Sequence, residues 1–133
     1  MNLIVVYYSM TNQTEEFIKK VKPKCPDIRF ARLQIGQNGI PEDEFLLITP
    51  TYNQGQIPMP VKRFLEPEET HEKLLGVVSS GNKNWGKMFA NAGNIISEQY
   101  DVPLLHKYEL RGNEMDVDTV VDIIHTLAAL KGE

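Results

Sequence analysis

Strand-like apolar runs alternate with helix-like segments from one end of the chain to the other, and this alternation restricts the fold more than any other feature. Residues 3–8 and 45–49 are almost continuously apolar, as expected for strands that are buried on both faces. Strands that alternate with helices form a parallel sheet covered by helices on both sides. The expected strands are 3–8, 28–33, 45–49, 74–79 and 102–110, and the expected helices are 14–21, 61–65, 85–100 and 116–130.

Right-handed crossovers leave few topologies for five such strands, and the flavodoxin-like order 2-1-3-4-5 fits them. We therefore expect an α/β fold in three layers, with a doubly wound, five-stranded parallel sheet. The chain of 133 residues has the length of one domain. No linker or repeat divides it, so a single flavodoxin-like domain is expected over 1–133, with loops at 36–39 and 42–44.

Composition and charge exclude several classes of function. The net charge of −4 argues against binding of nucleic acid. No apolar run approaches the roughly 20 residues that cross a membrane, and no basic and then apolar leader opens the chain, so we expect a cytoplasmic protein with no membrane partner. The only cysteine, Cys25, is expected to be an incidental loop residue rather than a reactive thiol. His71, His106 and His125 lack ligand spacing, so no metal site is expected.

The loop Ser9 to Thr14 joins the first strand to the first helix, and it is rich in hydroxyl and amide groups. A helix that begins after a buried strand offers free N–H groups and the positive end of its dipole to an anion. The loop has neither the lysine of a nucleoside-triphosphate loop nor the glycine pattern of a dinucleotide fold. It suits the phosphate of a mononucleotide, although the same residue types also serve simply as helix caps.

Two further loops are expected beside this one. In open parallel sheets, ligands bind at the carboxyl ends of the strands, near the switch in strand order. The loops 49–58 and 79–86 follow the third and fourth strands and reach the same edge. The predicted cofactor-binding residues are Ser9, Met10, Thr11, Asn12, Gln13, Thr14, Pro50, Thr51, Tyr52, Asn53, Gly55, Ser80, Gly81, Asn82, Trp85 and Gly86.

Two aromatic residues in these loops indicate what kind of ligand the site takes. Tyr52 offers a stacking face for a flat ring, or is an exposed loop aromatic. Trp85 lies where a helix is expected to begin beside the site, or anchors that helix in the core. A phosphate loop next to two aromatic loops favours a planar mononucleotide, for which flavin mononucleotide (FMN) is the natural candidate.

Three segments of the chain resemble the NrdI family, small flavodoxin-like proteins that serve class Ib ribonucleotide reductase. Residues 75–86 are similar to the family signature Gly-Val-x-x-Ser-Gly-Asn-x-Asn-aromatic. Residues 102–112 resemble the strand Val-Pro…Phe-Glu-Leu-x-Gly, and 92–97 match part of the preceding helix. The resemblance runs from about Leu3 to Val121. The phosphate loop departs from the usual Ser/Thr-x-Thr-Gly-Asn-Thr, because its last three residues here are Asn-Gln-Thr.

The resemblance implies an FMN-binding redox protein whose partner is NrdF, the small subunit of the reductase. In its reduced state such a protein reacts with dioxygen, and the superoxide or peroxide formed drives assembly of the dimanganese-tyrosyl radical cofactor of NrdF. The sequence does not identify the donor that reduces the flavin. The flavin supplies the chemistry, so we name no catalytic acid or base.

The charges around the expected site suit this chemistry. No charged residue occurs from Thr49 to Met59, and the third loop carries only Lys83 and Lys87. Carboxylates near a flavin oppose its anionic, fully reduced form, so their absence should bring the two one-electron steps closer together. Two alternatives remain: a general electron-transfer flavodoxin for another reductase, and a flavin-free interaction module of the same fold.

Overall fold

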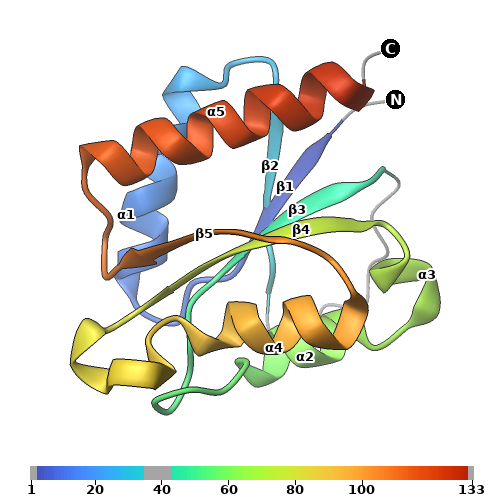
Figure 1. Cartoon of the computed structure of the whole chain (residues 1–133). Coiled ribbons are helices and arrows are strands. Elements are labelled where there is room, and N and C mark those ends of the chain that lie inside the picture. The colour runs from blue at the N-terminus through green and yellow to red at the C-terminus, as the bar shows by residue number, and fades with distance from the viewer. Residues whose placement is uncertain (1–2, 35–42, 132–133) are drawn as a thin grey trace.

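The computed structural model describes residues 3–34 and 43–131 of the chain, and its centre is a five-stranded parallel sheet (Figure 1). The strand order is β2-β1-β3-β4-β5, which confirms the predicted 2-1-3-4-5 topology. All four neighbouring pairs are parallel. The strands are β1 (Ile4–Tyr7), β2 (Arg29–Arg32), β3 (Phe45–Thr49), β4 (Leu74–Gly81) and β5 (Leu104–Glu109).

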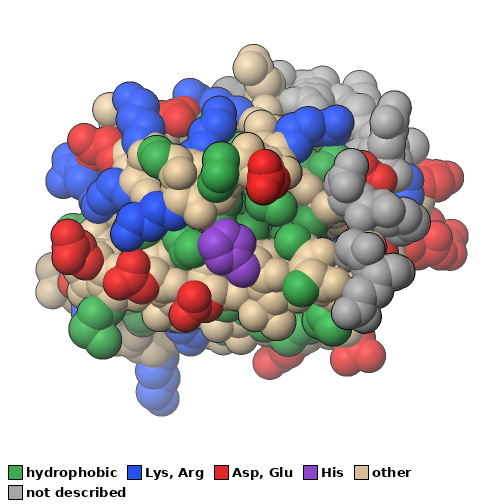
Figure 2. Space-filling view, turned by 90° about the horizontal axis from the view of Figure 1, so that it is seen from above, with side chains coloured by type: hydrophobic (Ala, Val, Ile, Leu, Met, Phe, Trp, Pro, Cys, Tyr) green, Lys and Arg blue, Asp and Glu red, His purple; other side chains and the backbone are tan. Residues whose placement is uncertain are grey.

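Helices cover both faces of this sheet, which gives the predicted three layers (Figure 1). One layer contains α1 (Asn12–Val21) and α5 (Glu114–Lys131). Figure 2 shows the molecule from the side of α5, where apolar, basic and acidic side chains are intermixed on the surface. The other contains α2 (Met59–Leu65), the short α3 (Glu68–His71) and α4 (Asn91–Tyr100). Two short 3-10 helices, Lys22–Lys24 and Lys83–Met88, complete the order.

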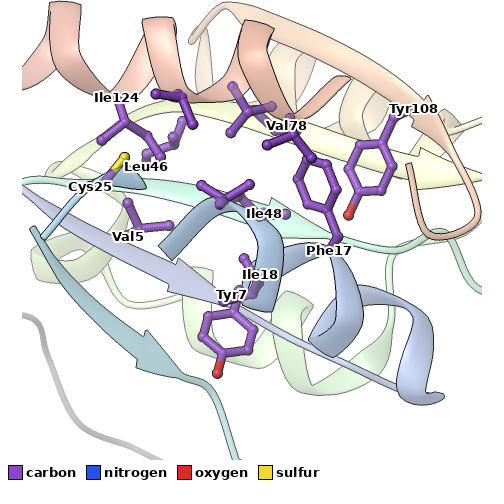
Figure 3. Close-up of a cluster of buried hydrophobic side chains, with 14 of the residues drawn as sticks. Val5, Tyr7, Phe17, Ile18, Cys25, Leu46, Ile48, Val78, Tyr108 and Ile124 are labelled. Carbon is purple, nitrogen blue, oxygen red and sulfur yellow. The ribbon is translucent and has the colours of Figure 1, made fainter. Parts of the chain in front are cut away.

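Alternate residues of the central strands point to opposite faces of the sheet and pack into two separate hydrophobic cores. Val5 packs into the cluster under α1 and α5, whereas its neighbour Ile4 packs into the cluster under α2 and α4. Figure 3 shows the first of these clusters, with side chains from both helices meeting those of the strands. Every residue of β3 is buried, as expected for the middle strand of a sheet covered on both faces.

Cys25 is a core residue and not the incidental loop cysteine that we expected. It follows a 3-10 helix, but its side chain is only 1% exposed and belongs to the cluster under α1 and α5. Burial raises the pKa of its thiol, because the thiolate is poorly solvated there. A protonated and inaccessible thiol has little nucleophilic reactivity.

The main error of the sequence prediction is the helix expected over 85–100. Its first part is the 3-10 helix Lys83–Met88, and α4 begins only at Asn91. Gly86 has φ 57° and ψ −120°, and Ala90 is left-handed with φ 52°, so a continuous α-helix cannot pass through either residue. Smaller differences affect the ends of other elements, and the short α3 was not predicted. The loop expected at 36–39, and the first residue of 42–44, lie outside the described residues.

Candidate functional site

A pocket of about 230 Å³ lies at the carboxyl edge of the sheet, where the loops after β1, β3 and β4 meet. Most of the predicted cofactor-binding residues line it. These are Met10, Thr11, Gln13, Thr14, Pro50, Thr51, Ser80, Gly81, Asn82 and Trp85. Six predicted residues do not line it: Ser9, Asn12, Tyr52, Asn53, Gly55 and Gly86. The structure thus brings the three loops together, as the switch in strand order predicts.

The hydroxyl groups of the first loop cap α1. The Thr11 hydroxyl accepts a hydrogen bond from the Gln13 amide at 3.4 Å, and the Ser9 hydroxyl accepts one from the Glu15 amide at 3.3 Å. Ser9 also donates to the carbonyl oxygen of Thr11. Both caps are longer than the usual 2.7–3.2 Å, so they stabilise the first turn only weakly. The capping interpretation is therefore correct for these side chains, but capping leaves this helix end incompletely satisfied.

The first turn of α1 keeps amide groups available to a ligand. An α-helix leaves its first amides without partners in the preceding turn, and the two side-chain caps reach only the amides of Gln13 and Glu15. Free N–H groups at a helix N-terminus are the usual partners of a phosphate. Asn12 does not line the pocket with its side chain, so its contribution there is limited to the backbone.

The beginning of α4 differs, because side chains from the sheet satisfy it. The Thr51 hydroxyl accepts a hydrogen bond from the Ala92 amide at 3.2 Å, and the Ser79 hydroxyl accepts one from the Gly93 amide at 3.1 Å. The two hydroxyl oxygens lie 3.4 Å apart, and both are buried. Thr51 was predicted to bind a cofactor, but its hydroxyl group is used to hold α4 against the site.

The middle loop forms a tight turn beside the pocket. Tyr52 and Gln56 exchange two backbone hydrogen bonds, each 2.7 Å long, and enclose the three residues between them. The side chain of Asn91 donates to the carbonyl oxygen of Gly55 at 2.8 Å and ties the turn to α4. Tyr52 is 50% exposed, so its ring is free to cover a ligand at the pocket mouth but does not line the pocket.

The third loop folds back on itself before α4 begins. A β-carbon on Gly81 would lie 2.5 Å from the backbone nitrogen of Ala90, so only glycine allows the two backbone segments to come this close. Gly81 lines the pocket, but the space that a side chain would need is occupied by its own chain. Trp85 lines the pocket and is only half-buried, so it is not the core anchor of a helix. Gly86 faces open space outside the pocket.

Sequence reasoning missed residues in β5 and directly after it. Leu110, directly after β5, lines the pocket with a left-handed backbone, and its amide donates to the carbonyl oxygen of Gly81 at 3.1 Å. Tyr108, two residues earlier, lies buried with its hydroxyl group near the pocket residues Ser80 and Thr14. Residues 102–110 were expected to form the fifth strand, and 102–112 to resemble a family strand, but none of them was assigned to the site. The place of this strand beside the fourth strand could have suggested a contribution to the site.

The pocket lining carries no charged side chain. Charged residues line two adjoining surface hollows: one shares Leu110 with the pocket and includes Lys83 and Glu109, and the other shares Met10 and includes Arg32. In the first hollow the Glu109 carboxylate accepts a hydrogen bond from the Lys83 backbone amide at 3.2 Å. A ligand in the pocket would therefore be held by hydroxyl, amide and apolar groups rather than by ion pairs.

Two other findings concern the described residues only. They contain no group of three or more His, Cys, Asp and Glu side chains placed to hold a metal ion. None of their helices has both the length and the apolar character needed to cross a bilayer.

The doubly wound parallel sheet and the uncharged polar pocket at its carboxyl edge define a flavodoxin-like protein. Solved structures agree with this class. The structure of oxidised flavodoxin 2 from Bacillus cereus matches 97% of this chain and 99% of its own, with a TM-score of 0.69 and 19% identity. A short-chain flavodoxin associated with a bacterial microcompartment matches all of both chains, with a TM-score of 0.71 and 18% identity.

Sequence comparison identifies the family within this class. The model of the NrdI flavodoxin-like family matches residues 5–122. The protein NrdI of Macrococcus caseolyticus (strain JCSC5402) is 40% identical over 115 residues, which cover 86% of this chain and 83% of that protein. The chain belongs to the NrdI flavodoxin-like family, as its sequence motifs predicted. Membership of a flavodoxin-like family implies a flavin-binding site.

Proposed function

We propose that this chain is an FMN-binding redox protein that supports class Ib ribonucleotide reductase. In this proposal it supplies superoxide, peroxide or electrons for assembly of the dimanganese-tyrosyl radical cofactor of the small subunit, NrdF. Family membership and the flavodoxin-like fold support the proposal. We place this activity in the cytoplasm, where a lone thiol such as Cys25 stays reduced.

The observation that carries the proposal is the pocket that the three loops form at the carboxyl edge of the sheet. Its phosphate end would be the first turn of α1, where amides that the side-chain caps do not reach adjoin the hydroxyl groups of Thr11 and Thr14. These groups suit a phosphate that is bound without a lysine, because a helix N-terminus stabilises an anion through N–H groups and its dipole. The proposed FMN-binding residues are the predicted residues that line the pocket, together with Leu110, the backbone of Asn12 and the ring of Tyr52 at the mouth.

The size of the pocket supports an exposed flavin ring. A volume of about 230 Å³ is smaller than the ~300–1,000 Å³ of pockets that enclose a whole drug-sized ligand. The phosphate and sugar-alcohol chain of FMN would fill it, and the ring would lie at its mouth between Trp85 and Tyr52. When bound, a reduced flavin gives dioxygen one electron to form superoxide, or two electrons with two protons to form hydrogen peroxide.

Apolar side chains around the mouth support docking of a protein partner over the ring. Met10 is 38% exposed, Met88 44% and Leu110 38%, although all three are apolar. Exposed apolar residues that gather at one place are typical of interaction sites, and methionine adapts its shape to a partner surface. NrdF is the partner that we propose for this surface.

The test is a visible absorption spectrum of the purified chain with FMN, followed by anaerobic titration with dithionite and then by exposure to dioxygen. We expect shifted flavin bands, bleaching in a nearly two-electron process, and re-oxidation that produces superoxide or peroxide. Addition of manganese-loaded NrdF should then give the tyrosyl radical signal by electron paramagnetic resonance.

Other outcomes would favour the alternatives. If FMN binds but the reduced protein generates no radical in NrdF, a general electron-transfer flavodoxin is the better description. If FMN does not bind, the phosphate-site argument fails, and a flavin-free interaction module of this fold is favoured.

A further inference from the structure

The hydroxyl group of Tyr108 is buried and has no hydrogen-bond partner among the residues that the structure describes. The side chain is 1% exposed, and its ring stacks on that of Phe17 with centroids 4.0 Å apart and planes 20° apart. Figure 3 shows the two rings side by side, with the Tyr108 oxygen pointing away from α5. Buried hydroxyl groups nearly always have a partner, so an unpartnered one needs an explanation.

The ring by itself does not need this hydroxyl group. Stacking on Phe17 uses only the aromatic face. An unsatisfied polar atom in a core reduces stability unless something pairs with it.

The groups that face this oxygen belong to the pocket. Ser80 lies directly opposite Tyr108 in the pairing of β4 with β5. Burial raises the pKa of Tyr108 far above its usual range, and the nearby hydroxyl groups of Ser80 and Thr14, although neither meets hydrogen-bond geometry with the phenol oxygen, lower it, while the carboxylate of Asp116 raises it. Ser80 and Thr14 both line the pocket, one from the end of β4 and the other from the first turn of α1. The Tyr108 hydroxyl group thus lies under the end of the pocket that we assign to phosphate.

Asp116 acts on this hydroxyl group only through its charge, because its carboxylate makes no hydrogen bond with the Tyr108 oxygen and is held by two other groups. One carboxylate oxygen accepts a hydrogen bond at 2.8 Å from the amide of Asn113, and the other pairs with the His106 ring at 2.8 Å. The hydroxyl groups of Ser80 and Thr14 are left as the polar groups that face the Tyr108 oxygen from the pocket.

We propose that Tyr108 is a positioning residue for the phosphate of the bound mononucleotide. Its hydroxyl group donates a hydrogen bond to the hydroxyl oxygen of Ser80 or Thr14, and that group then directs its own proton at a phosphate oxygen. A hydroxyl group both donates and accepts, so such a chain is possible without any charged residue. Each bond in the chain polarises the next, which strengthens the contact with an anion. This inference rests on the proposed function, because it concerns the same site.

The test compares two ligands that differ only in the phosphate. Tyr108→Phe removes one oxygen atom and keeps the ring, and Tyr100→Phe is the matched control. Tyr100 lies at the end of α4 and stacks on His71, away from the pocket. We expect Tyr108→Phe to weaken FMN binding about fivefold and riboflavin binding by less than twofold. Tyr100→Phe should leave both affinities within twofold of the original protein.

Stability of the ligand-free protein separates positioning from a structural role. If the oxygen is unpaired without ligand, Tyr108→Phe keeps or raises the urea midpoint of the ligand-free protein. The inference is overturned if FMN and riboflavin binding weaken equally, or if neither changes. It is also overturned if Tyr108→Phe lowers the unfolding free energy of the ligand-free protein by as much as it lowers the free energy of FMN binding.

A second probe keeps the inference independent of flavin binding. If the original protein binds neither FMN nor riboflavin, the proposed function fails. The inference about Tyr108 is then tested with inorganic phosphate as the ligand. Phosphate, compared with chloride at equal ionic strength, should raise the melting temperature of the original protein more than that of Tyr108→Phe. Equal shifts in the two proteins, or no shift in either, would overturn the inference as well.

Discussion

Single residues at the site have roles that depend on contacts with distant parts of the chain. Gly81 is the clearest example, because the space that a β-carbon would need is taken by the backbone of Ala90. Gly86 is glycine for another reason: its backbone has φ 57° and ψ −120°, which other residues rarely adopt, and nothing lies within 4 Å of an added β-carbon.

These two glycines give a matched pair of substitutions. We expect Gly81→Ala to destabilise the protein by about 3 kcal/mol and to weaken FMN binding more than tenfold, because it forces apart two backbone segments beside the pocket. Gly86→Ala should cost about 1–3 kcal/mol from backbone strain, with FMN affinity within twofold. Urea unfolding and fluorescence titration measure both effects. Equal loss of affinity in the two variants would contradict this explanation.

Buried thiol and phenol groups give the protein a predictable response to alkali. Burial raises the pKa of Cys25 from its usual 9.0, and the pKa of Tyr108 is raised from 10.0. The folded protein keeps these protons at a pH where the unfolded chain loses them, so unfolding releases protons. Stability is therefore complete below about pH 8 and falls as the pH rises past about 9.

Urea midpoints at pH 7.5, 9.0 and 10.5 measure this response. Tyr108→Phe removes one of the titrating groups, so its stability should fall less steeply between pH 9.0 and 10.5 than that of the original protein. Identical slopes would show that the phenol does not contribute, and stability that rises with pH would contradict the argument altogether.

At the scale of elements, the local pattern of apolar residues predicted the strands correctly. It failed for the start of α4, where contacts with a distant part of the chain determine the backbone conformation. The strands were located well because buried strands such as β3 carry a continuous apolar run. The helix expected over 85–100 was wrong in its first part, because Ala90 returns to Gly81 and the chain must take left-handed backbone to do so. The spacing of apolar residues along the sequence does not predict this close approach of Ala90 to Gly81.

The start of α4 depends on the sheet for its stability, and this dependence is testable. Ala90 provides no side-chain cap, so the hydroxyl group of Thr51 takes over that role from the end of β3. Thr51→Val keeps the shape but leaves the Ala92 amide buried without its partner. We expect a loss of about 1–3 kcal/mol in urea unfolding. Thr119→Val, at an exposed position of α5, is the control and should change stability by less than about 0.5 kcal/mol.

At the scale of the whole molecule, the position of the site could be predicted from the sequence, but the role of each of its residues could not. Parallel strands bring their carboxyl ends to one edge, so the three loops had to meet there. Which hydroxyl groups face the pocket and which cap helices depends on side-chain directions. The role of the Thr51 hydroxyl group in holding α4 was therefore not foreseen, and Leu110 and Tyr108 were missed because no residue of the expected strand 102–110 was assigned to the site.

The uncharged lining of the pocket leads to the last prediction, which concerns reduction potentials. The turn Tyr52–Gln56 lies beside the pocket mouth and has no charge. A carboxylate about 8 Å from a flavin ring opposes its anionic reduced form by roughly 1–2 kcal/mol at an effective dielectric of about 20–40. Asn53→Asp adds such a charge with almost no change of shape, at a backbone with φ 46° that aspartate also tolerates.

We expect Asn53→Asp to make the second one-electron potential more negative and so to separate the two steps of a reductive titration, with the effect decreasing as salt is added. Gln99→Glu places the same charge at the far end of α4, where the chain turns toward the start of β5, and should leave both potentials unchanged. If both variants shift the potentials equally, net charge and not the local environment controls the flavin. If neither shifts them, the ring does not lie near the turn Tyr52–Gln56, and its assignment to the mouth of the pocket is wrong.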